Sequence, residues 1–307
     1  MKSIRKLVGV EKAVDFVKAC LYSAFLKDSE RPVSFLLAAE PESGKTGTLK
    51  QFCDSRSVHY LTSGTAYGIV RDLLPKMKNK DVRYLLMGDL NVLTGMSQKT
   101  KNQLVNSFLS PLIEEGILNI SSYAVGESNP VPVKCGFGAT LTPGVLTDGR
   151  TRKWIESGFL SRLMVMSYSY SSALVARIKV GQSKGFQLEK PPELPDKDYD
   201  VAMPSRYDTT IVDWSDDMGE IFKTRGIRAH RDLRQLAKAL ALIRVLENDL
   251  PRQGIEVNLQ DIADLGELVH YFNLDYNLID REMSVNDEFL ELEIHKEGSG
   301  SELSSGS

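Results

Sequence analysis

The sequence has few cysteines and no large excess of one charge. Its three cysteines lie far apart in 307 residues, and no two of them have the spacing of a metal site or a redox motif. They are typical of reduced thiols in a cytoplasmic protein. The net charge of -3 excludes a chain that is basic as a whole. Any contact with nucleic acid must therefore come from local patches or from a ring of subunits.

Long apolar stretches are also missing. No run of about 18 apolar residues occurs, so we expect no transmembrane helix and no membrane partner. The N-terminal residues MKSIRKLVGVEKAVDF lack the apolar segment of a secretory signal, which favours a cytoplasmic location. Glycine and serine dominate the last residues, EGSGSELSSGS, so the segment 291–307 is predicted to be a disordered tail or an added linker.

Four short apolar runs predict strands that are buried on both faces of a sheet. They cover residues 33–38, 82–87, 137–141 and 163–167. Apolar residues at helical spacing predict helices over residues 8–26, 46–53 and 99–115. Strands that alternate with helices favour an α/β fold with a central parallel sheet.

The remaining segments complete the predicted organisation of the chain. Residues 117–122 and 131–135 are β-like and flank GESNP, which predicts a hairpin with its turn in that pentapeptide. Proline and charged residues are frequent in 186–204, which predicts a linker. Helices predicted over 228–246 and 259–272 follow it. We expect an α/β core at 1–185, a linker at 186–204 and a small α-helical lid at 205–290.

The stretch FLLAAEPESGKTGTLKQF has the form of a phosphate-binding loop between a buried strand and a helix. The predicted nucleotide-binding residues are Glu40, Pro41, Glu42, Ser43, Gly44, Lys45, Thr46 and Gly47. Backbone N–H groups and the helix dipole favour phosphate there, Lys45 would neutralise its oxygens, and the Thr46 hydroxyl would hold Mg²⁺. ATP and Mg²⁺ are therefore the predicted cofactors. Ala39 stands where such a loop usually has its first glycine, which costs little if that position needs no positive φ.

An NTPase also needs a carboxylate at the end of a neighbouring strand to hold Mg²⁺. Asp89, just past the apolar run in YLLMGDLNVL, is the predicted metal ligand. Leu90 follows where a second acid, which polarises the attacking water, is usual. If the two acid positions are instead aligned one residue earlier, Gly88 takes the first acid position and Asp89 the second. The sequence leaves both alignments open. Glu114 and Glu115, at the end of the next predicted helix, are candidate replacements for the base.

With these motifs in order, the chain resembles the AAA+ ATPases, and specifically their clade with a hairpin inserted in helix 2, which includes the minichromosome-maintenance helicases. LVGVEKAVDFVKACL resembles the helix that such ATPases place before the phosphate loop. LIEEGILNISSYAVGESNPVPVKCGFGATLTP resembles their helix, inserted hairpin and next strand. The pattern D…EEG…GFLSR is also similar to ATPases of phage or mobile-element type. The resemblance implies a P-loop AAA+ core, an inserted β-hairpin and a helical lid.

The resemblance also implies roles for particular residues. GATLTP looks like sensor 1, with Thr142 placed to orient the attacking water or contact the γ-phosphate. GFLSRLMVMSYS looks like the arginine-finger segment, in which Arg162 would act on the site of a neighbouring subunit. GIRAHRDLRQLAKALAL looks like the sensor 2 helix, in which Arg228 would reach the phosphates of its own subunit. A solvated basic face is the alternative for this arginine-rich helix.

An arginine finger requires a neighbour, so the resemblance implies a homo-oligomeric ring or filament, most often of six subunits. The hairpin at 119–134 would project toward the central pore. There Tyr123, Asn129 and Lys134 are candidate contacts to DNA, and Lys99 and Lys101 belong to a second candidate loop.

Three functions compete at this stage. The first is an ATP-hydrolysing motor on DNA, such as a helicase or translocase. The second is a slow ATP-gated switch or matchmaker that recruits an unidentified partner protein in replication, transposition or phage defence, and the missing second acid favours it. The third is a remodeller of proteins that does not touch DNA. Stimulation of hydrolysis by single-stranded DNA distinguishes the motor from the other two.

Overall fold

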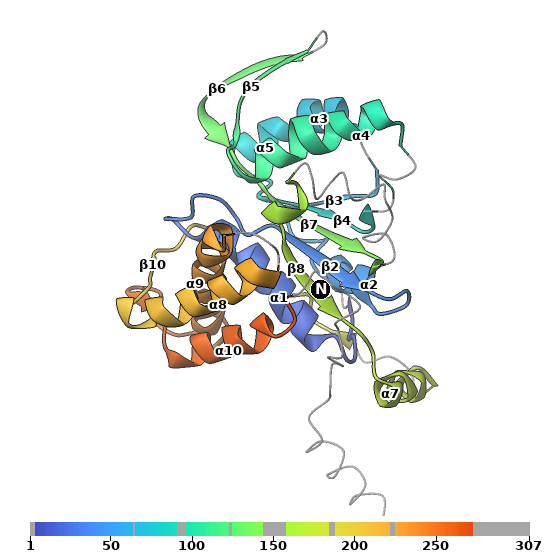
Figure 1. Cartoon of the computed structure of the whole chain (residues 1–307), viewed down its shortest axis with the longest axis vertical. Coiled ribbons are helices and arrows are strands. Elements are labelled where there is room, and N and C mark those ends of the chain that lie inside the picture. The colour runs from blue at the N-terminus through green and yellow to red at the C-terminus, as the bar shows by residue number, and fades with distance from the viewer. Residues whose placement is uncertain are drawn as a thin grey trace, which may run out of the picture.

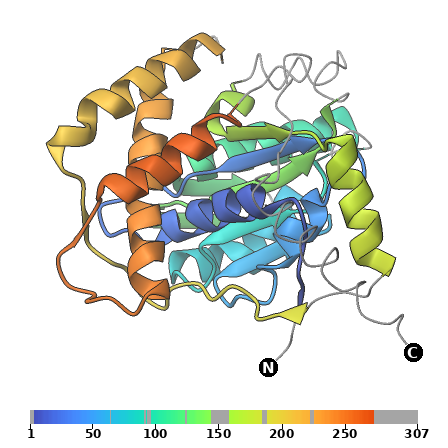
Figure 2. The same ribbon diagram turned by 90° about the horizontal axis from the view of Figure 1, so that it is seen from below.

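The computed structural model describes residues 4–63, 65–90, 92, 96–122, 125–143, 158–183, 188–221 and 225–272. In this part of the chain, a parallel five-stranded sheet lies between two sets of helices (Figures 1 and 2). The predicted α/β fold with a central parallel sheet is confirmed. Residues 273–290 of the predicted lid and the predicted tail at 291–307 lie outside the described residues.

The central sheet contains the strands β2 (Phe35–Ala39), β3 (Val58–Leu61), β4 (Tyr84–Met87), β7 (Gly136–Leu141) and β8 (Met164–Tyr168). Its order is β3-β4-β7-β2-β8, and every neighbouring pair is parallel. The first of these strands in the chain, β2, therefore lies between the last two, β7 and β8. Ligands of open α/β sheets bind at the carboxyl ends of the strands, beside such a switch in strand order.

The sequence predicts four of these strands and misses β3. The four predicted strands are buried along their whole length. By contrast, β3 is an edge strand, and its two central residues, His59 and Tyr60, are only half-buried. A strand of this kind lacks the continuous apolar run that marks a strand with two covered faces.

The side chains of β2 alternate between two apolar cores, one on each face of the sheet. Phe35, Leu37 and Ala39 belong to the first core, and Leu36 and Ala38 belong to the second. This is the alternation of a strand with both faces covered. It explains why the sequence of β2 is apolar at every position.

Different helices cover the two faces of the sheet. The first face carries α1 (Glu11–Tyr22) and α2 (Lys45–Lys50); the second carries α3 (Ala66–Lys78), α4 (Gln98–Leu104), the π-helical segment η3 (Val105–Leu109) and α5 (Ser110–Ile113). The last three run on without a break, so the helix predicted at 99–115 contains a π-helical stretch in its middle. Shorter elements are η1 (Ser23–Phe25), η5 (Leu160–Arg162) and η6 (Ser205–Tyr207), and α7 (Ser172–Ser183) follows β8.

The predicted hairpin is present, but its turn lies elsewhere. The strands β5 (Ile117–Ser122) and β6 (Val125–Val133) pair antiparallel, and Ser122 pairs with Val125. The pentapeptide GESNP is therefore part of β6, and the prediction that it forms the turn is wrong. In a two-stranded ribbon each strand has one unpaired edge, where proline is tolerated because no N–H is needed. Figure 1 shows the hairpin projecting beyond α3–α5.

The C-terminal part of the described chain is helical. It contains α8 (Asp208–Ile221), α9 (Ile227–Glu247) and α10 (Leu259–Val269), with a short parallel pair of strands, β10 (Val201–Ala202) and β11 (Ile255–Glu256). The helix α9 packs against α8, α10 and α1. The predicted helices at 228–246 and 259–272 correspond to α9 and α10, whereas α7 and α8 were not predicted. The apolar core of these helices is continuous with that of the first sheet face.

The described part of the segment predicted as a linker, 188–204, lies against the α/β core. The strand β9 (Leu188–Glu189) pairs antiparallel with β1 (Ile4–Arg5). The buried Tyr199 donates its N–H to the Phe25 carbonyl, 2.7 Å away, and Asp198 pairs with both Arg83 and Lys80. Specific contacts therefore fix this segment in place. None of the helices in the described chain is long and apolar enough to span a membrane.

Candidate nucleotide-binding site

The predicted phosphate loop connects the carboxyl end of β2 to the start of α2. Two of its residues have left-handed backbone conformations, Glu42 with φ of 63° and Gly44 with φ of 77°. Left-handed residues alternating with ordinary ones turn successive N–H groups toward one point, which makes an anion-binding nest. Ala39 is the last residue of β2 and needs no positive φ. The missing first glycine therefore does not strain the loop.

Lys45 is folded back onto the loop that precedes it. Its ammonium donates to the Ala39 carbonyl at 2.5 Å, to the Glu40 carbonyl, and to the Ser43 hydroxyl at 3.3 Å. Burial lowers the pKa of Lys45, and the negative charges of Asp89 and Glu40 partly offset this. A buried ammonium surrounded by carbonyl oxygens at the centre of an anion nest is suited to exchange those oxygens for phosphate oxygens.

Two tyrosines that the sequence did not reveal hold the loop from the side of β8. The hydroxyls of Tyr168 and Tyr170 both donate to the Ser43 carbonyl, at 3.1 and 2.7 Å. Burial raises the pKa of Tyr170 to about 12, so its hydroxyl remains a donor at neutral pH. A Cβ on Gly44 would lie 3.0 Å from this hydroxyl oxygen, so a side chain there would be crowded, and its φ of 77° also favours glycine.

The Gly88 carbonyl, just past β4, joins the phosphate loop to the middle of the sheet. It accepts hydrogen bonds from Thr46 Oγ1, at 3.2 Å, and from the hydroxyl of Thr140 on β7. The Gly88 backbone thus lies next to Thr46, and Asp89 is close enough to Lys45 for its charge to act on that ammonium. We adopt as a hypothesis the alignment in which Gly88 has the first acid position and Asp89 the second. Leu90 is fully buried and supplies no acid.

Thr142 follows β7 at the same edge of the sheet as the loop. It is two residues beyond Thr140, so both threonines belong to the same face of the extended chain. The sequence singled out Thr142, but of these two threonines it is Thr140 whose hydroxyl has a defined partner, the Gly88 carbonyl.

The residues present fit a magnesium–nucleotide complex. Thr46 and Thr140 offer hydroxyl oxygens and Asp89 a carboxylate, and oxygen ligands are those that Mg²⁺ prefers. The nest and Lys45 supply donors for phosphate. Among the described residues, no three His, Cys, Asp or Glu side chains gather into a metal site of their own, so a cation here would depend on ligands from the nucleotide.

The predicted arginines lie at the opposite edge of the sheet. Arg162 immediately precedes β8, whereas the phosphate loop follows β2, and these two strands are parallel neighbours. A strand of five residues separates the two edges by about 15 Å. Arg228 joins Arg162 there, since its guanidinium contacts the Ser161 hydroxyl at 3.2 Å and Glu114 at 3.4 Å.

Glu114 is the centre of this arginine cluster. It pairs with Arg31, Arg228 and Arg231, and Arg162 approaches it to 4.0 Å. Burial disfavours the charge of Glu114, but the arginines outweigh this and hold its pKa below the ordinary value. A carboxylate committed to so many cations is a poor base.

The cluster also anchors α9 to the core. The fully buried Arg31 donates to both oxygens of Asp232 on α9, at 3.2 Å, and to the Ile113 carbonyl at 2.9 Å. Arg234 pairs with Asp208 on α8. The arginines of this helix therefore make specific ion pairs, and a merely solvated basic face does not describe them.

Two predicted roles do not fit this arrangement. Arg228 is at the amino edge, so it does not reach the phosphate loop of its own chain. Glu115 is exposed and lies near enough to Arg162 to influence its pKa, which places it at the same edge. Neither residue is brought to the loop by the described structure, because the strands between them hold the two edges apart.

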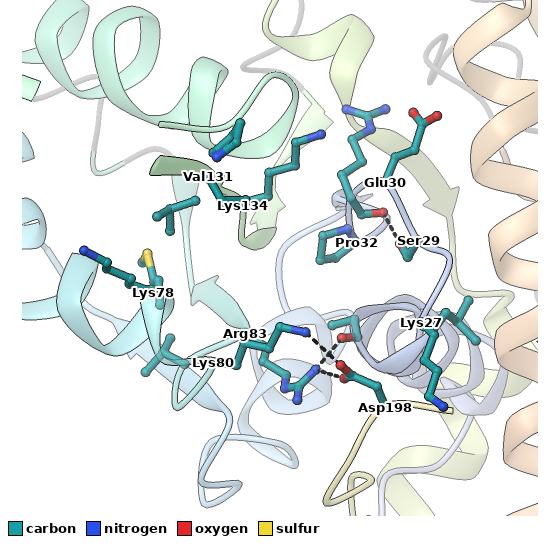
Figure 3. Close-up of a pocket in the computed structure, with 17 residues that line it drawn as sticks. Lys27, Ser29, Glu30, Pro32, Lys78, Lys80, Arg83, Val131, Lys134 and Asp198 are labelled. Atoms are coloured by element: carbon teal, nitrogen blue, oxygen red, sulfur yellow. Dashed lines mark hydrogen bonds and ion pairs between the residues drawn. The ribbon is translucent and has the colours of Figure 1, made fainter. Parts of the chain in front are cut away.

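A hollow of about 580 Å³ opens at the amino edge, beside the base of the hairpin. Figure 3 shows Lys27, Lys78 and Lys134 around it, with Arg83 and Asp198 joined by an ion pair. Lys134, predicted as a DNA contact, thus belongs to a basic surface that the sequence did not reveal, because its members come from separate elements.

The structure describes only some of the other residues predicted to contact DNA. Tyr123 lies outside the described residues, and of Asn129 only the backbone, within β6, is described. Lys99 is exposed on α4, whereas Lys101 is buried and therefore a weak candidate for a phosphate contact.

Comparison with known proteins gives a distant similarity. No protein-family model and no curated protein matches the sequence. Among solved structures, the chain is similar to a full-length MCM homolog from Methanopyrus kandleri, with 16% sequence identity and a TM-score of 0.48. The matched region covers 87% of this chain and 56% of the other, so the chain spans about half the length of that protein. Any statement about function must therefore rest on the site itself.

Proposed function

We propose that the chain is an AAA+ ATPase of the helix-2-insert clade, which binds ATP and Mg²⁺ and hydrolyses ATP between subunits of a ring or filament. The observation that carries this proposal is the loop between β2 and α2. Its left-handed Glu42 and Gly44 form an anion nest, and Lys45 is drawn into it. The helix that follows is short, so the nest itself, rather than a helix dipole, is the main support for phosphate binding.

Each residue at the carboxyl edge then has a role. The N–H groups of the loop bind phosphate oxygens, and Lys45 leaves the Ala39 and Glu40 carbonyls to meet them. The Thr46 hydroxyl, which donates to the Gly88 carbonyl in this structure, would hold Mg²⁺. Asp89, in the second acid position, orients the attacking water. The bound magnesium–nucleotide supplies the electrophilic phosphorus and neutralises charge that develops on the leaving group.

The arginine cluster supports a site that is shared between subunits. Arg162 and Arg228 lie together, far from the loop of their own chain, and their side chains keep 18% and 42% of their surface exposed. The planar guanidinium group matches phosphoryl oxygens. We therefore assign both arginines to the nucleotide of a neighbouring subunit, in a ring for which the family resemblance implies six subunits.

We further propose that residues 1–185 act as the nucleotide-binding core and 205–290 as the lid. The anchoring of α9 to Glu114 through Arg31 gives the lid a firm connection to the arginine cluster. The hairpin at 119–134 and the lysines at its base would face DNA, where Lys78 and Lys134 would meet phosphates.

The first test is steady-state ATP hydrolysis by the purified chain, with and without single-stranded DNA. Lys45→Ala should abolish nucleotide binding, because it removes the cation at the centre of the nest. Unchanged ATP affinity in this variant would overturn the proposal. Strong stimulation by DNA would identify a motor.

The alternative is a slow ATP-gated switch or matchmaker, and Gly88 favours it. With no carboxylate in the first acid position, the site has one negative charge fewer near the metal than a fast ATPase of this type. Slow turnover that ignores DNA would support this reading. The third candidate function, a remodeller of proteins, has less support because it assigns no role to the basic surface beside the hairpin.

A further inference from the structure

In the proposed alignment Gly88 has the first acid position, and a side chain there would collide with Tyr60 as it lies in the structure. A Cβ on Gly88 would lie 1.9 Å from the Tyr60 hydroxyl oxygen and 2.9 Å from Tyr60 Cζ. The same point is 3.6 Å from Thr46 Cγ2. The Tyr60 hydroxyl therefore occupies the space beside Thr46 that an acidic side chain at the end of β4 would need.

The strand pairing explains how Tyr60 reaches this position. Tyr60 pairs with Leu86 in the parallel ladder of β3 and β4, and Gly88 is two residues beyond Leu86, just past the end of β4. Residues two apart in an extended chain share a face, so the Tyr60 ring and Gly88 lie on the same side of the sheet. The long phenol extends toward the carboxyl edge, and only glycine at position 88 lets it pass.

The Tyr60 hydroxyl has the chemistry of a neutral oxygen ligand. Burial, with the charges of Cys53 and Asp89, raises the pKa of Tyr60, so the phenol stays protonated at neutral pH. Such a hydroxyl can donate one hydrogen bond and accept another. Within the described chain, no hydrogen bond joins this hydroxyl to another residue. Its donor and its acceptor can therefore bind a water molecule or a ligand.

We propose that Tyr60 takes over the place of the missing first acid and orients a water of the Mg²⁺ that Thr46 holds. The inference rests on the proposed ATPase function. Tyr60 is a positioning residue here: it touches the metal's water and leaves the reacting atoms to Asp89 and Lys45. A neutral phenol keeps the hydrogen bond but not the charge, so this site holds Mg²⁺ less tightly than one with two carboxylates.

The test is a titration of a fluorescent ATP analogue onto the full chain, in EDTA and at increasing Mg²⁺. Tyr60→Phe keeps the ring and removes only the hydroxyl. It should leave metal-free binding unchanged and weaken Mg²⁺-dependent binding roughly ten-fold, the usual effect of one hydrogen bond in a charged site. Tyr67→Phe is the matched control, because Tyr67 is an exposed tyrosine on α3 and should change neither.

A double variant tests the replacement directly. Tyr60→Ala/Gly88→Asp makes room for a carboxylate in the usual place. It should recover the Mg²⁺-dependent affinity that Tyr60→Ala alone loses.

The inference fails if Tyr60→Phe binds the ATP analogue with the same Mg²⁺ dependence as the wild type. It also fails if the variant loses the same affinity with and without Mg²⁺, because that result would assign the Tyr60 hydroxyl to packing of the site. Absence of nucleotide binding by the wild-type chain would remove the proposed function itself, and this result is separate from either failure of Tyr60.

Discussion

At the scale of single residues, the phosphate loop depends on hydroxyl groups that come from distant strands. Tyr170→Phe removes the 2.7 Å bond to the Ser43 carbonyl and leaves that of Tyr168 in place. We expect the loop to lose part of its fixed shape and nucleotide to bind roughly five-fold more weakly, which corresponds to about 1 kcal/mol. Isothermal titration with ATP measures this. The melting temperature should barely change, and a large drop would instead assign Tyr170 to folding.

Residues of this kind set the limit of what the sequence can predict about the site. Lys45 and Thr46 belong to one contiguous motif whose spacing is fixed by the loop, so the sequence places them next to each other. Tyr60, Thr140 and Tyr170 meet the loop only because three strands end at one edge of the sheet. These contacts depend on the order of the strands in the sheet, which cannot be read from the spacing of residues along the sequence.

At the scale of elements, the segment after α7 is held to the core by Asp198. Lys80, at 2.7 Å, and Arg83 pair with this carboxylate. Partial burial opposes the charge of Asp198, but these cations outweigh it and hold its pKa below 3.8, the ordinary value. A carboxyl whose pKa falls on folding stabilises the folded state above its unfolded pKa, and this stabilisation is lost as the pH falls through the folded value.

Asp198→Asn should therefore lower the free energy of unfolding by about 1 kcal/mol at pH 7. The difference from the wild type should shrink below pH 4 and vanish once the wild-type carboxyl is protonated. Urea unfolding at several pH values measures this. Glu193→Gln is the control, because Glu193 is an exposed acid of the same segment that pairs only across the surface with Lys190, and it should change the free energy of unfolding much less at pH 7. A difference that stays constant down to pH 3 would contradict the ion-pair explanation.

Elements differed in how well the sequence predicts them, and the reason is burial. Strands buried along their whole length are mostly apolar, so β2, β4, β7 and β8 were identifiable. The strand β3 lies at an edge of the sheet with two half-buried residues, and the hairpin has only two strands. Their sequences therefore carry turn-forming and polar residues inside strands, as in β6, and local preference is misleading there.

At the scale of the whole molecule, the parallel sheet separates the proposed phosphate site from the arginine cluster. The nest, Thr46 and Asp89 lie at the carboxyl edge, and Arg162 and Arg228 lie at the amino edge with Glu114. The strands hold these two groups of residues at opposite edges of one chain. Under the proposed function, a second copy would complete the site by presenting its amino edge to the loop of the first copy.

This division predicts recovery of activity by mixing two inactive variants. Lys45→Ala subunits lack a working loop but retain Arg162, whereas Arg162→Ala subunits retain the loop. In a random one-to-one mixture, about a quarter of the interfaces pair an intact loop with an intact arginine. ATP hydrolysis should then rise to about that fraction of the wild-type rate, while each variant alone stays inactive. If Arg162 acts within its own chain, every site in the mixture contains a defect, and the mixture stays as inactive as its components.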